Sequence, residues 1–186
     1  MTLPLEQLLK LEPEEMVKHS ERLTQTQLRE KTQTYYEDVH VGQELPKYID
    51  TFSEEDLLKW CNATENTHNA HYDYPSALYH DFIPGVLHSG VWRQAILCSW
   101  LKDWVLPNGW FFKAGWQVRQ MVVMGETTIA WGKITKKYEK GGLGFVDLEI
   151  GIKNQNGEEG CPGTATLVLP LKGGRAVPYP FVMPAE

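Results

Sequence analysis

The sequence has few cysteines, no excess of basic residues and no long apolar runs. Its three cysteines, Cys61, Cys98 and Cys161, form no C-x-x-C pair and follow no regular spacing. Such a set fits free thiols in a reducing compartment and excludes a disulfide framework. The net charge of −6 argues against nucleic acid or an anionic membrane as a partner, because these select a basic face. No apolar run is long enough to cross a bilayer.

The first residues, MTLPLEQLLKLEPEEM, also lack the basic start and the continuous apolar stretch of a signal peptide. We therefore expect a cytoplasmic protein. The length of 186 residues suits one domain with an ordinary core. Leucines at helical spacing predict a helical extension over residues 1–34, with Met16 and Val17 on its pattern and Pro13 starting a second helix. The domain should cover 35–171, followed by an irregular tail, 172–186, rich in proline and glycine.

Within this domain the patterning predicts one long buried helix and a run of strands. The helix should begin near Ser89 and reach Trp104, and it is apolar on nearly all sides, so it belongs inside the fold. Strands are expected at 47–52, 110–123, 127–138, 144–153 and 163–171. A helix should begin at the capping-box-like Ser53-Glu54-Glu55-Asp56 and end at about Ala63. The run from Tyr74 to Asp81 should be irregular, because Pro75 breaks it.

Glycines at 141–142 and 157 favour hairpin turns between the later strands. An antiparallel sheet wrapped around one apolar helix is an α+β arrangement, the hot-dog architecture.

The densest set of chemically active groups is the stretch Asn66-Thr67-His68-Asn69-Ala70-His71-Tyr72-Asp73. It holds two histidines, two asparagines and an aspartate in eight residues, directly after the first predicted helix of the domain. This stretch is the candidate site.

From about Tyr36 to Pro170 the sequence resembles the MaoC-like dehydratase family of hot-dog proteins. Six weak motifs occur in the family's order, and the N-terminal extension and the tail lie outside the resemblance. The motifs are Tyr36-Glu37-Asp38-Val39 with Val41-Gly42, Ala63-Thr64, His71-Tyr72-Asp73, Pro84-Gly85-Val86-Leu87-His88, Met124-Gly125-Glu126-Thr127, and Asn154-Gln155-Asn156-Gly157-Glu158 before Leu169-Pro170.

The family includes (R)-specific enoyl-CoA hydratases, whose signature is Asp-x-Asn-Pro-x-His. At the same spacing this sequence keeps the histidine as His71, but Asn66 stands at the catalytic aspartate position. His68 replaces the family's asparagine and Asn69 its proline. The resemblance therefore implies that His71 and Asn66 are the catalytic residues, with one carboxylate changed to an amide.

Hydration of an unsaturated thioester needs a base, an acid and donors for the enolate-like oxygen. In the family, the aspartate and the histidine hold a water, and an amide at the start of the buried helix is the oxyanion donor, which here belongs to Ser89 or Gly90. Asn66 can orient water but cannot accept its proton. His71 could serve alone as both base and acid, or one of the nearby acids Glu65, Asp73 and Asp81 could replace the aspartate. The residues expected to bind substrate are His68, Asp73, His88, Ser89 and Gly90.

Three functions fit these features. The first is hydration or dehydration of an acyl-CoA thioester, with CoA as part of the substrate and no separate cofactor. The second is a non-catalytic partner subunit of a heteromeric MaoC-like hydratase, which the missing aspartate favours and the retained His71 and Asp73 disfavour. The third is a thioesterase, for which the sequence has no separate acidic motif. In each case we expect a homodimer or larger oligomer, or a heterodimer with another MaoC-like chain.

Structural explanations exist for the same residues. His71 would cap the loop, and Asn66 would brace the turn after the helix. His68-x-x-His71, with Asp73 and His80 nearby, has no helical H-E-x-x-H frame, so we expect no metal site. The basic residues Arg93, Arg119, Lys133, Lys136 and Lys137 are either candidates for the CoA phosphates or solvated charges.

Overall fold

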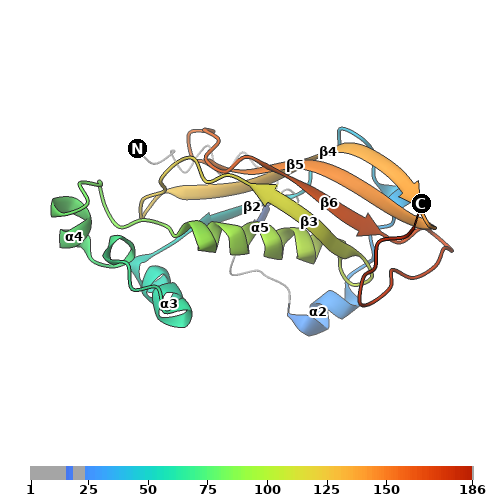
Figure 1. Cartoon of the computed structure of the whole chain (residues 1–186), viewed down its shortest axis with the longest axis horizontal. Coiled ribbons are helices and arrows are strands. Elements are labelled where there is room, and N and C mark those ends of the chain that lie inside the picture. The colour runs from blue at the N-terminus through green and yellow to red at the C-terminus, as the bar shows by residue number, and fades with distance from the viewer. Residues whose placement is uncertain (1–15, 19–23, 186) are drawn as a thin grey trace.

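The computed structural model describes residues 16–18 and 24–185. A six-stranded sheet in the order β1-β2-β4-β5-β6-β3 curves over the long helix α5, Gly90–Val105 (Figure 1). All neighbours pair antiparallel except β1 and β2, which are parallel. The expected α+β hot-dog arrangement is confirmed. The strands are β1 Met16–Lys18, β2 Lys47–Thr51, β3 Trp110–Trp116, β4 Thr127–Lys140, β5 Leu143–Asn154 and β6 Gly163–Leu169.

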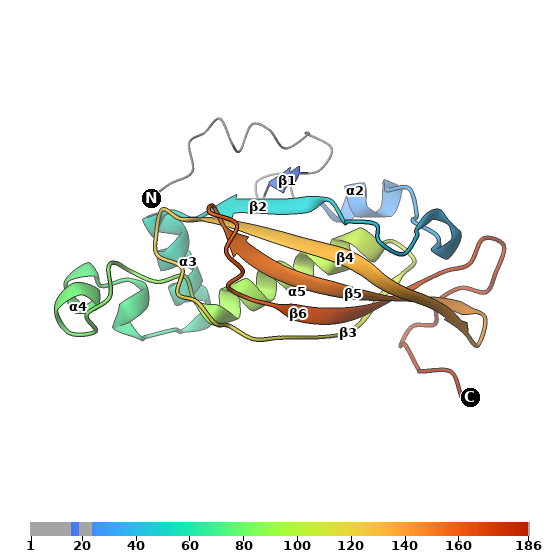
Figure 2. The ribbon, with the colours of Figure 1, turned by 90° about the horizontal axis from the view of Figure 1, so that it is seen from above.

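Helix α5 lies along one face of the sheet, as the view from above shows (Figure 2). Its Leu97, Leu101 and Val105 are fully buried, and Trp92 and Trp100 are nearly so. These side chains meet the inward residues of β4, β5 and β6 in one apolar cluster. The apolar residues of this helix therefore face the sheet, while Val91, Gln94 and Lys102 lie on its exposed side. No helix among the described residues has the length and apolar character needed to cross a membrane.

Helix α3, Glu54–Thr64, begins where the sequence predicts. Ser53 Oγ accepts the Asp56 amide at 3.2 Å, and the Asp56 carboxylate accepts the Ser53 amide at 3.0 Å, which completes a capping box. The helix ends at Glu65, which has a left-handed φ of 52°. This reversal directs the chain into the polar stretch 66–73.

Two predictions about the following segments are wrong. The run after Asp73 is helical, not irregular: α4 spans Tyr74–Tyr79. Pro75 lies in its first turn, where a missing N–H breaks no helical hydrogen bond, and Asp73 caps it by accepting the Ser76 amide at 3.1 Å.

The strand expected at 110–123 ends at Trp116. Beyond it the chain leaves β6 and runs beside the segment that enters α5. The His88 amide donates to the Val122 carbonyl at 2.8 Å, and the Met124 amide donates to the Val86 carbonyl at 2.9 Å. The covering segment, defined here as residues 117–124, therefore lies over the start of α5.

The N-terminal region differs from the predicted helical extension. Residues Met16–Lys18 form the strand β1 beside β2, because an open sheet edge offers unpaired backbone groups. A short helix, α2, spans Gln25–Glu30. The helices expected within 1–15, including the start at Pro13, lie outside the described residues.

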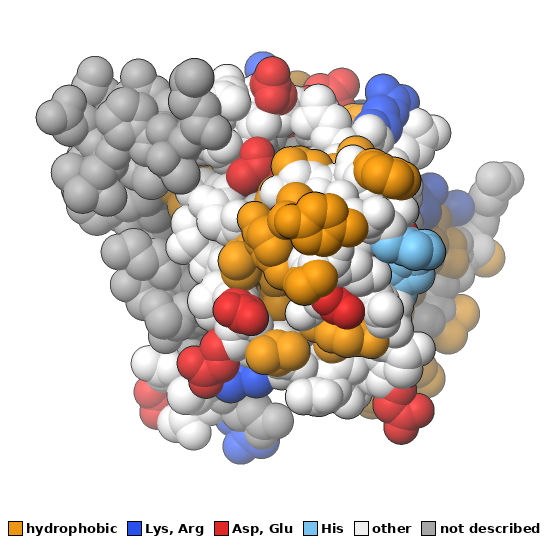
Figure 3. Space-filling model, turned by 90° about the vertical axis from the view of Figure 1, so that its left-hand side faces the viewer, with side chains coloured by type: hydrophobic (Ala, Val, Ile, Leu, Met, Phe, Trp, Pro, Cys, Tyr) orange, Lys and Arg blue, Asp and Glu red, His pale blue; other side chains and the backbone are white. Residues whose placement is uncertain are grey.

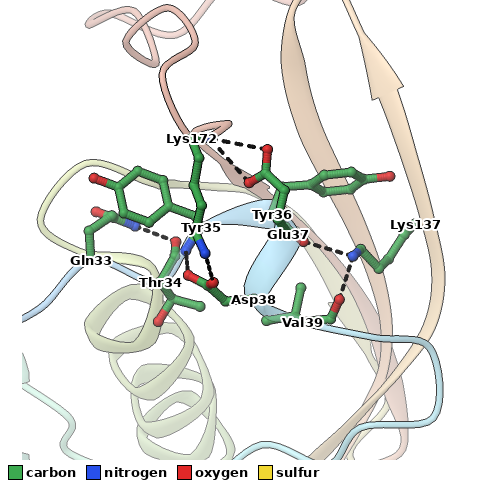
Figure 4. A network of polar contacts seen from close by, with 9 residues as sticks. All are labelled: Gln33, Thr34, Tyr35, Tyr36, Glu37, Asp38, Val39, Lys137 and Lys172. Atoms are coloured by element: carbon green, nitrogen blue, oxygen red, sulfur yellow. Dashed lines mark hydrogen bonds and ion pairs between the residues drawn. The ribbon is translucent and has the colours of Figure 1, made fainter.

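A polar network fastens the segment after α2 to the sheet and the tail (Figure 4). Lys137 donates to the carbonyls of Tyr36 and Val39, while Lys172 pairs with Asp38. The Lys172 amide also bonds the Glu37 carboxylate at 3.1 Å. These contacts join three stretches that are distant in sequence.

The tail has no helix or strand over 172–185. Val177 and Phe181 pack against a small cluster on the sheet that includes Trp110, Phe112 and Phe145. The Phe112 and Phe181 ring centroids are 5.2 Å apart. The tail therefore covers part of the sheet surface away from α5.

Candidate functional site

The polar stretch 66–73 is a compact loop held by its own side chains. Asn66 Oδ1 accepts the His68 amide at 3.3 Å, and His68 Nδ1 accepts the Ala70 amide at 3.2 Å. The single turn η4, Asn69–His71, follows. Asp73 then closes the loop as the cap of α4. These local hydrogen bonds connect successive residues of the loop, and Ala70 joins it to the segment before α5.

His71 is joined to the segment that leads into α5. Its Nδ1 lies 2.9 Å from the Leu87 carbonyl oxygen, and the Leu87 amide donates to the Ala70 carbonyl at 2.8 Å. A carbonyl only accepts, so Nδ1 must carry the proton. In the neutral ring this leaves the Nε2 lone pair available as a base. The half-buried imidazole is therefore oriented and held in one tautomer.

The N-terminus of α5 directly follows the segment that binds His71. Leu87, which binds the ring, is two residues before Ser89, the N-cap of the helix. Ser89 is buried, and its side chain makes no capping hydrogen bond. The first amides of a helix have no partner within it, and the helix dipole favours negative charge there. An oxyanion is the group that this position can stabilise.

His88 lies between these two features and is almost fully buried, with 2% of its surface exposed. Its ring stacks on Phe52 at 4.3 Å between centroids and meets the edge of Trp92 at 4.5 Å. Neither ring nitrogen has a hydrogen-bond partner within the described chain. Burial, followed by the charges of Arg93 and His71, lowers the pKa of His88 to about 3. His88 is therefore neutral at physiological pH.

The structure brings the residues expected in the site to one end of the molecule. His71 is tied to the segment that contains His88, Ser89 and Gly90, and the rings of His68 and His71 are 5.8 Å apart. Asn66 braces the loop through its Oδ1, and its side-chain N–H groups are not engaged in that bond. The Asp73 carboxylate is engaged as a helix cap, so its expected contact with substrate stays a prediction.

Sequence reasoning missed the position of Arg93. It was considered as a solvated charge or a CoA phosphate contact, but only 4% of its surface is exposed. Its Nη1 donates to the Gln120 carbonyl at 2.7 Å, and its Nε has no hydrogen-bond partner among the residues that the structure describes. The available signal was helical spacing, because Arg93 lies four residues before Leu97 and seven before Trp100, on the same apolar side of the helix. Lys137, another such candidate, is bound to the Tyr36 and Val39 carbonyls instead.

No group of three or more histidine, cysteine or acidic side chains in the described ranges is arranged to hold a metal ion.

The end of the molecule that contains the candidate site presents an exposed apolar surface (Figure 3). Exposed large apolar side chains occur on α4, on the loop after it, at the start of α5 and on the covering segment, and the most exposed of these is Phe82, in the loop after α4, at 86%. The others are Tyr74, Tyr79, Val91, Val118 and Met121.

No family model and no curated protein matches this sequence. Solved structures with a similar fold do match this chain. The unliganded R-hydratase PhaJ1 of Pseudomonas aeruginosa superposes with a TM-score of 0.66 at 18% identity, over 82% of this chain and 95% of that one. A MaoC-like dehydratase from Rhodospirillum rubrum gives 0.62 at 17% identity, over 73% and 96%. The chain has the hot-dog fold of the MaoC-like dehydratases.

The ChsH1–ChsH2 complex of Mycobacterium tuberculosis shares this hot-dog fold, with a TM-score of 0.60 at 16% identity over 70% of this chain and 98% of that one. In the present hot-dog domain the candidate site lies at the end where α5 begins. The loop 66–73, the N-terminus of α5 and the covering segment meet there.

Proposed function

We propose that this hot-dog protein hydrates an enoyl-CoA thioester and, in reverse, dehydrates a 3-hydroxyacyl-CoA. The proposal rests chiefly on one observation, the 2.9 Å contact between His71 Nδ1 and the Leu87 carbonyl. This contact orients the ring and leaves Nε2 free as a base beside the start of α5. The likeness to an R-hydratase and a MaoC-like dehydratase gives this chemistry as the first candidate for the fold.

In the proposed hydration, His71 Nε2 accepts a proton from water as the water oxygen bonds to the β-carbon of the substrate. The π-electrons move toward the thioester, and the negative charge on its oxygen is stabilised by the amide of Ser89 or Gly90. The imidazolium then returns the proton to the α-carbon. One ring serves as base and acid, so the histidine is neutral again after each turnover.

Asn66 has a supporting role in this scheme. An amide side chain can donate to the water oxygen and orient its lone pair, but it cannot remove the proton. General acid–base groups contribute about 10²- to 10⁴-fold each. We therefore propose that the reaction runs more slowly than it would with a carboxylate at position 66. His68, whose ring is 5.8 Å from that of His71, and His88 complete the proposed substrate contacts.

A partner subunit is the second candidate function. One structural neighbour, ChsH1–ChsH2, is a complex of two different chains. In that case this chain would shape the acyl site, and a second MaoC-like chain would supply the aspartate and histidine. The amide at Asn66 and the exposed apolar surface around Phe82 favour this alternative. Thioester hydrolysis is the third candidate, and no carboxylate in the described part of the site is placed to support it.

The purified 186-residue chain should be incubated with enoyl-CoAs of several lengths, following loss of the conjugated thioester absorbance. We expect hydration that falls by about 10²- to 10⁴-fold in His71→Ala. Asn66→Asp should raise the rate if Asn66 occupies the position of the family's base. Turnover only after addition of a second MaoC-like chain would favour the partner function, and release of free CoA without hydration would favour hydrolysis. Size measurement of the same sample tests the proposed dimer.

A further inference from the structure

Arg93 is a buried cation for which the described chain supplies no anion. The molecule carries a net charge of −6, yet no carboxylate of residues 16–18 or 24–185 lies within ion-pair distance of this guanidinium. Its one hydrogen bond goes to the neutral Gln120 carbonyl. Arginine does not lose its proton in proteins, so the charge persists. A buried charge without a partner is strongly unfavourable, and structures normally supply one.

The guanidinium is directed toward the N-terminus of α5. Arg93 follows Gly90 by three residues and so lies on the same helix face. Side chains on a helix tilt toward its N-terminus. The covering segment confirms this direction, because Val118 lies within 4 Å of a Cβ built on Gly90, while Gln120 binds Arg93. The positive helix end and the guanidinium therefore converge under one segment.

The acids near this region are already engaged. Glu159 bonds the Trp131 indole and the amides of Ile152 and Cys161. Glu126 accepts the Val123 amide. Burial raises the pKa of the neighbouring Cys161 thiol, so it is not the missing anion at neutral pH.

The remaining acidic positions in the site loop do not supply the anion either. Asp73 caps α4, and position 66 holds an amide where the resemblance places an aspartate. The neutral His88, whose two nitrogens lack partners, adds an unused hydrogen-bonding group beside Arg93. The described part of the site therefore contains a buried guanidinium, that of Arg93, and no carboxylate placed to pair with it.

We propose that the substrate's acyl group carries its own carboxylate, which pairs with Arg93 while the thioester oxygen binds the start of α5. This inference rests on the proposed hydratase function for the identity of the thioester. Asn66 fits it, because a carboxylate at position 66 would repel a dicarboxylic acyl group. The ligand class is a short enoyl thioester with a terminal carboxylate.

The decisive comparison replaces a methyl group by a carboxylate. Wild-type protein should bind glutaryl-CoA more tightly than pentanoyl-CoA by about ten- to a hundredfold, as measured by calorimetry. Hydration of glutaconyl-CoA should exceed that of 2-pentenoyl-CoA by a similar factor. Four- and six-carbon pairs extend the test to other chain lengths. Arg93→Met should abolish the preference, and Arg93→Lys should retain part of it.

Arg119→Met is the matched control, because Arg119 lies in the same covering segment but is exposed and bonds Gln117. It should leave the ratio between the two ligands unchanged. Equal or weaker binding of the carboxylated ligand by wild-type protein would overturn the inference, whether or not Arg93→Met folds. Arg93-dependent binding of glutaryl-CoA without hydration of any enoyl-CoA would refute the hydratase function alone. Hydration without a carboxylate preference would refute only the present inference.

Discussion

Replacing His88 by phenylalanine should make the protein less sensitive to acid. In the folded chain burial, with the charges of Arg93 and His71, holds the pKa of His88 at about 3, while unfolding returns it to the ordinary value of 6.5. Between these values the unfolded state binds more protons than the folded state. Stability is therefore present above pH 6.5 and is lost as the pH falls toward 3.

The size of the effect follows from the two pKa values. From pH 7 to pH 5, protonation of His88 in the unfolded state alone should lower the free energy of unfolding by about 2 kcal/mol. Phenylalanine keeps the stacking on Phe52 and the edge contact with Trp92 but has nothing to protonate. It also removes two buried ring nitrogens that have no partner in the described chain. At pH 7 the variant should therefore be at least as stable as the wild type.

Urea unfolding followed by circular dichroism at pH 7 and pH 5 measures this difference directly. The loss of stability between the two pH values should be about 2 kcal/mol smaller in His88→Phe than in the wild type. The other titrating groups are common to both proteins, so their contributions to the free energy of unfolding cancel in this difference. His40→Gln, at an exposed histidine, is the control and should behave like the wild type. An equal acid loss in His88→Phe and wild type would show that His88 is protonated in the folded protein.

Two further changes test the scaffold around the site. Ser53→Ala removes the capping box of α3 and should lower the free energy of unfolding by about 1 kcal/mol, measured by urea titration; no change would mean that water replaces the cap. Gly144→Ala places a Cβ against the Tyr36 side chain and should cost about 1–3 kcal/mol, with faster hydrogen exchange in the segment around Tyr36. Gly115→Ala, where a Cβ meets nothing within 4 Å, is its control, and equal losses in the two variants would contradict the steric argument.

Local signals in the sequence predicted much of the fold. The Ser53 capping box, the glycine pair at 141–142 and the apolar composition of α5 each depend on neighbouring residues, and each prediction was confirmed. The errors arose where distant segments decide. Pro75 was interpreted as a breaker, but Asp73 makes its position a helix start. The strand expected beyond Trp116 ends there because the next residues pair with the segment before α5.

In the candidate site, as in the fold, local patterns could be interpreted from the sequence and contacts between distant segments could not. The motif spacing makes His71 the candidate base, but its tautomer depends on the Leu87 carbonyl, sixteen residues away. The burial of His88 and Arg93 depends on Phe52, Trp92 and the covering segment, which no local pattern connects to them. Sequence spacing therefore identifies chemical groups, while their protonation and charge balance follow from tertiary contacts.

The C-terminal tail limits how copies of this chain can assemble. With Val177 and Phe181 seated on Trp110, Phe112 and Phe145, this part of the sheet is buried on both faces. Two sheets cannot stack back to back there without displacing the tail. Strand β3, in contrast, ends the sheet and has one side without a strand partner among the described residues. Two copies could therefore pair through their β3 edges to form a continuous sheet, while the tail blocks face-to-face packing of their sheets over the part that it covers.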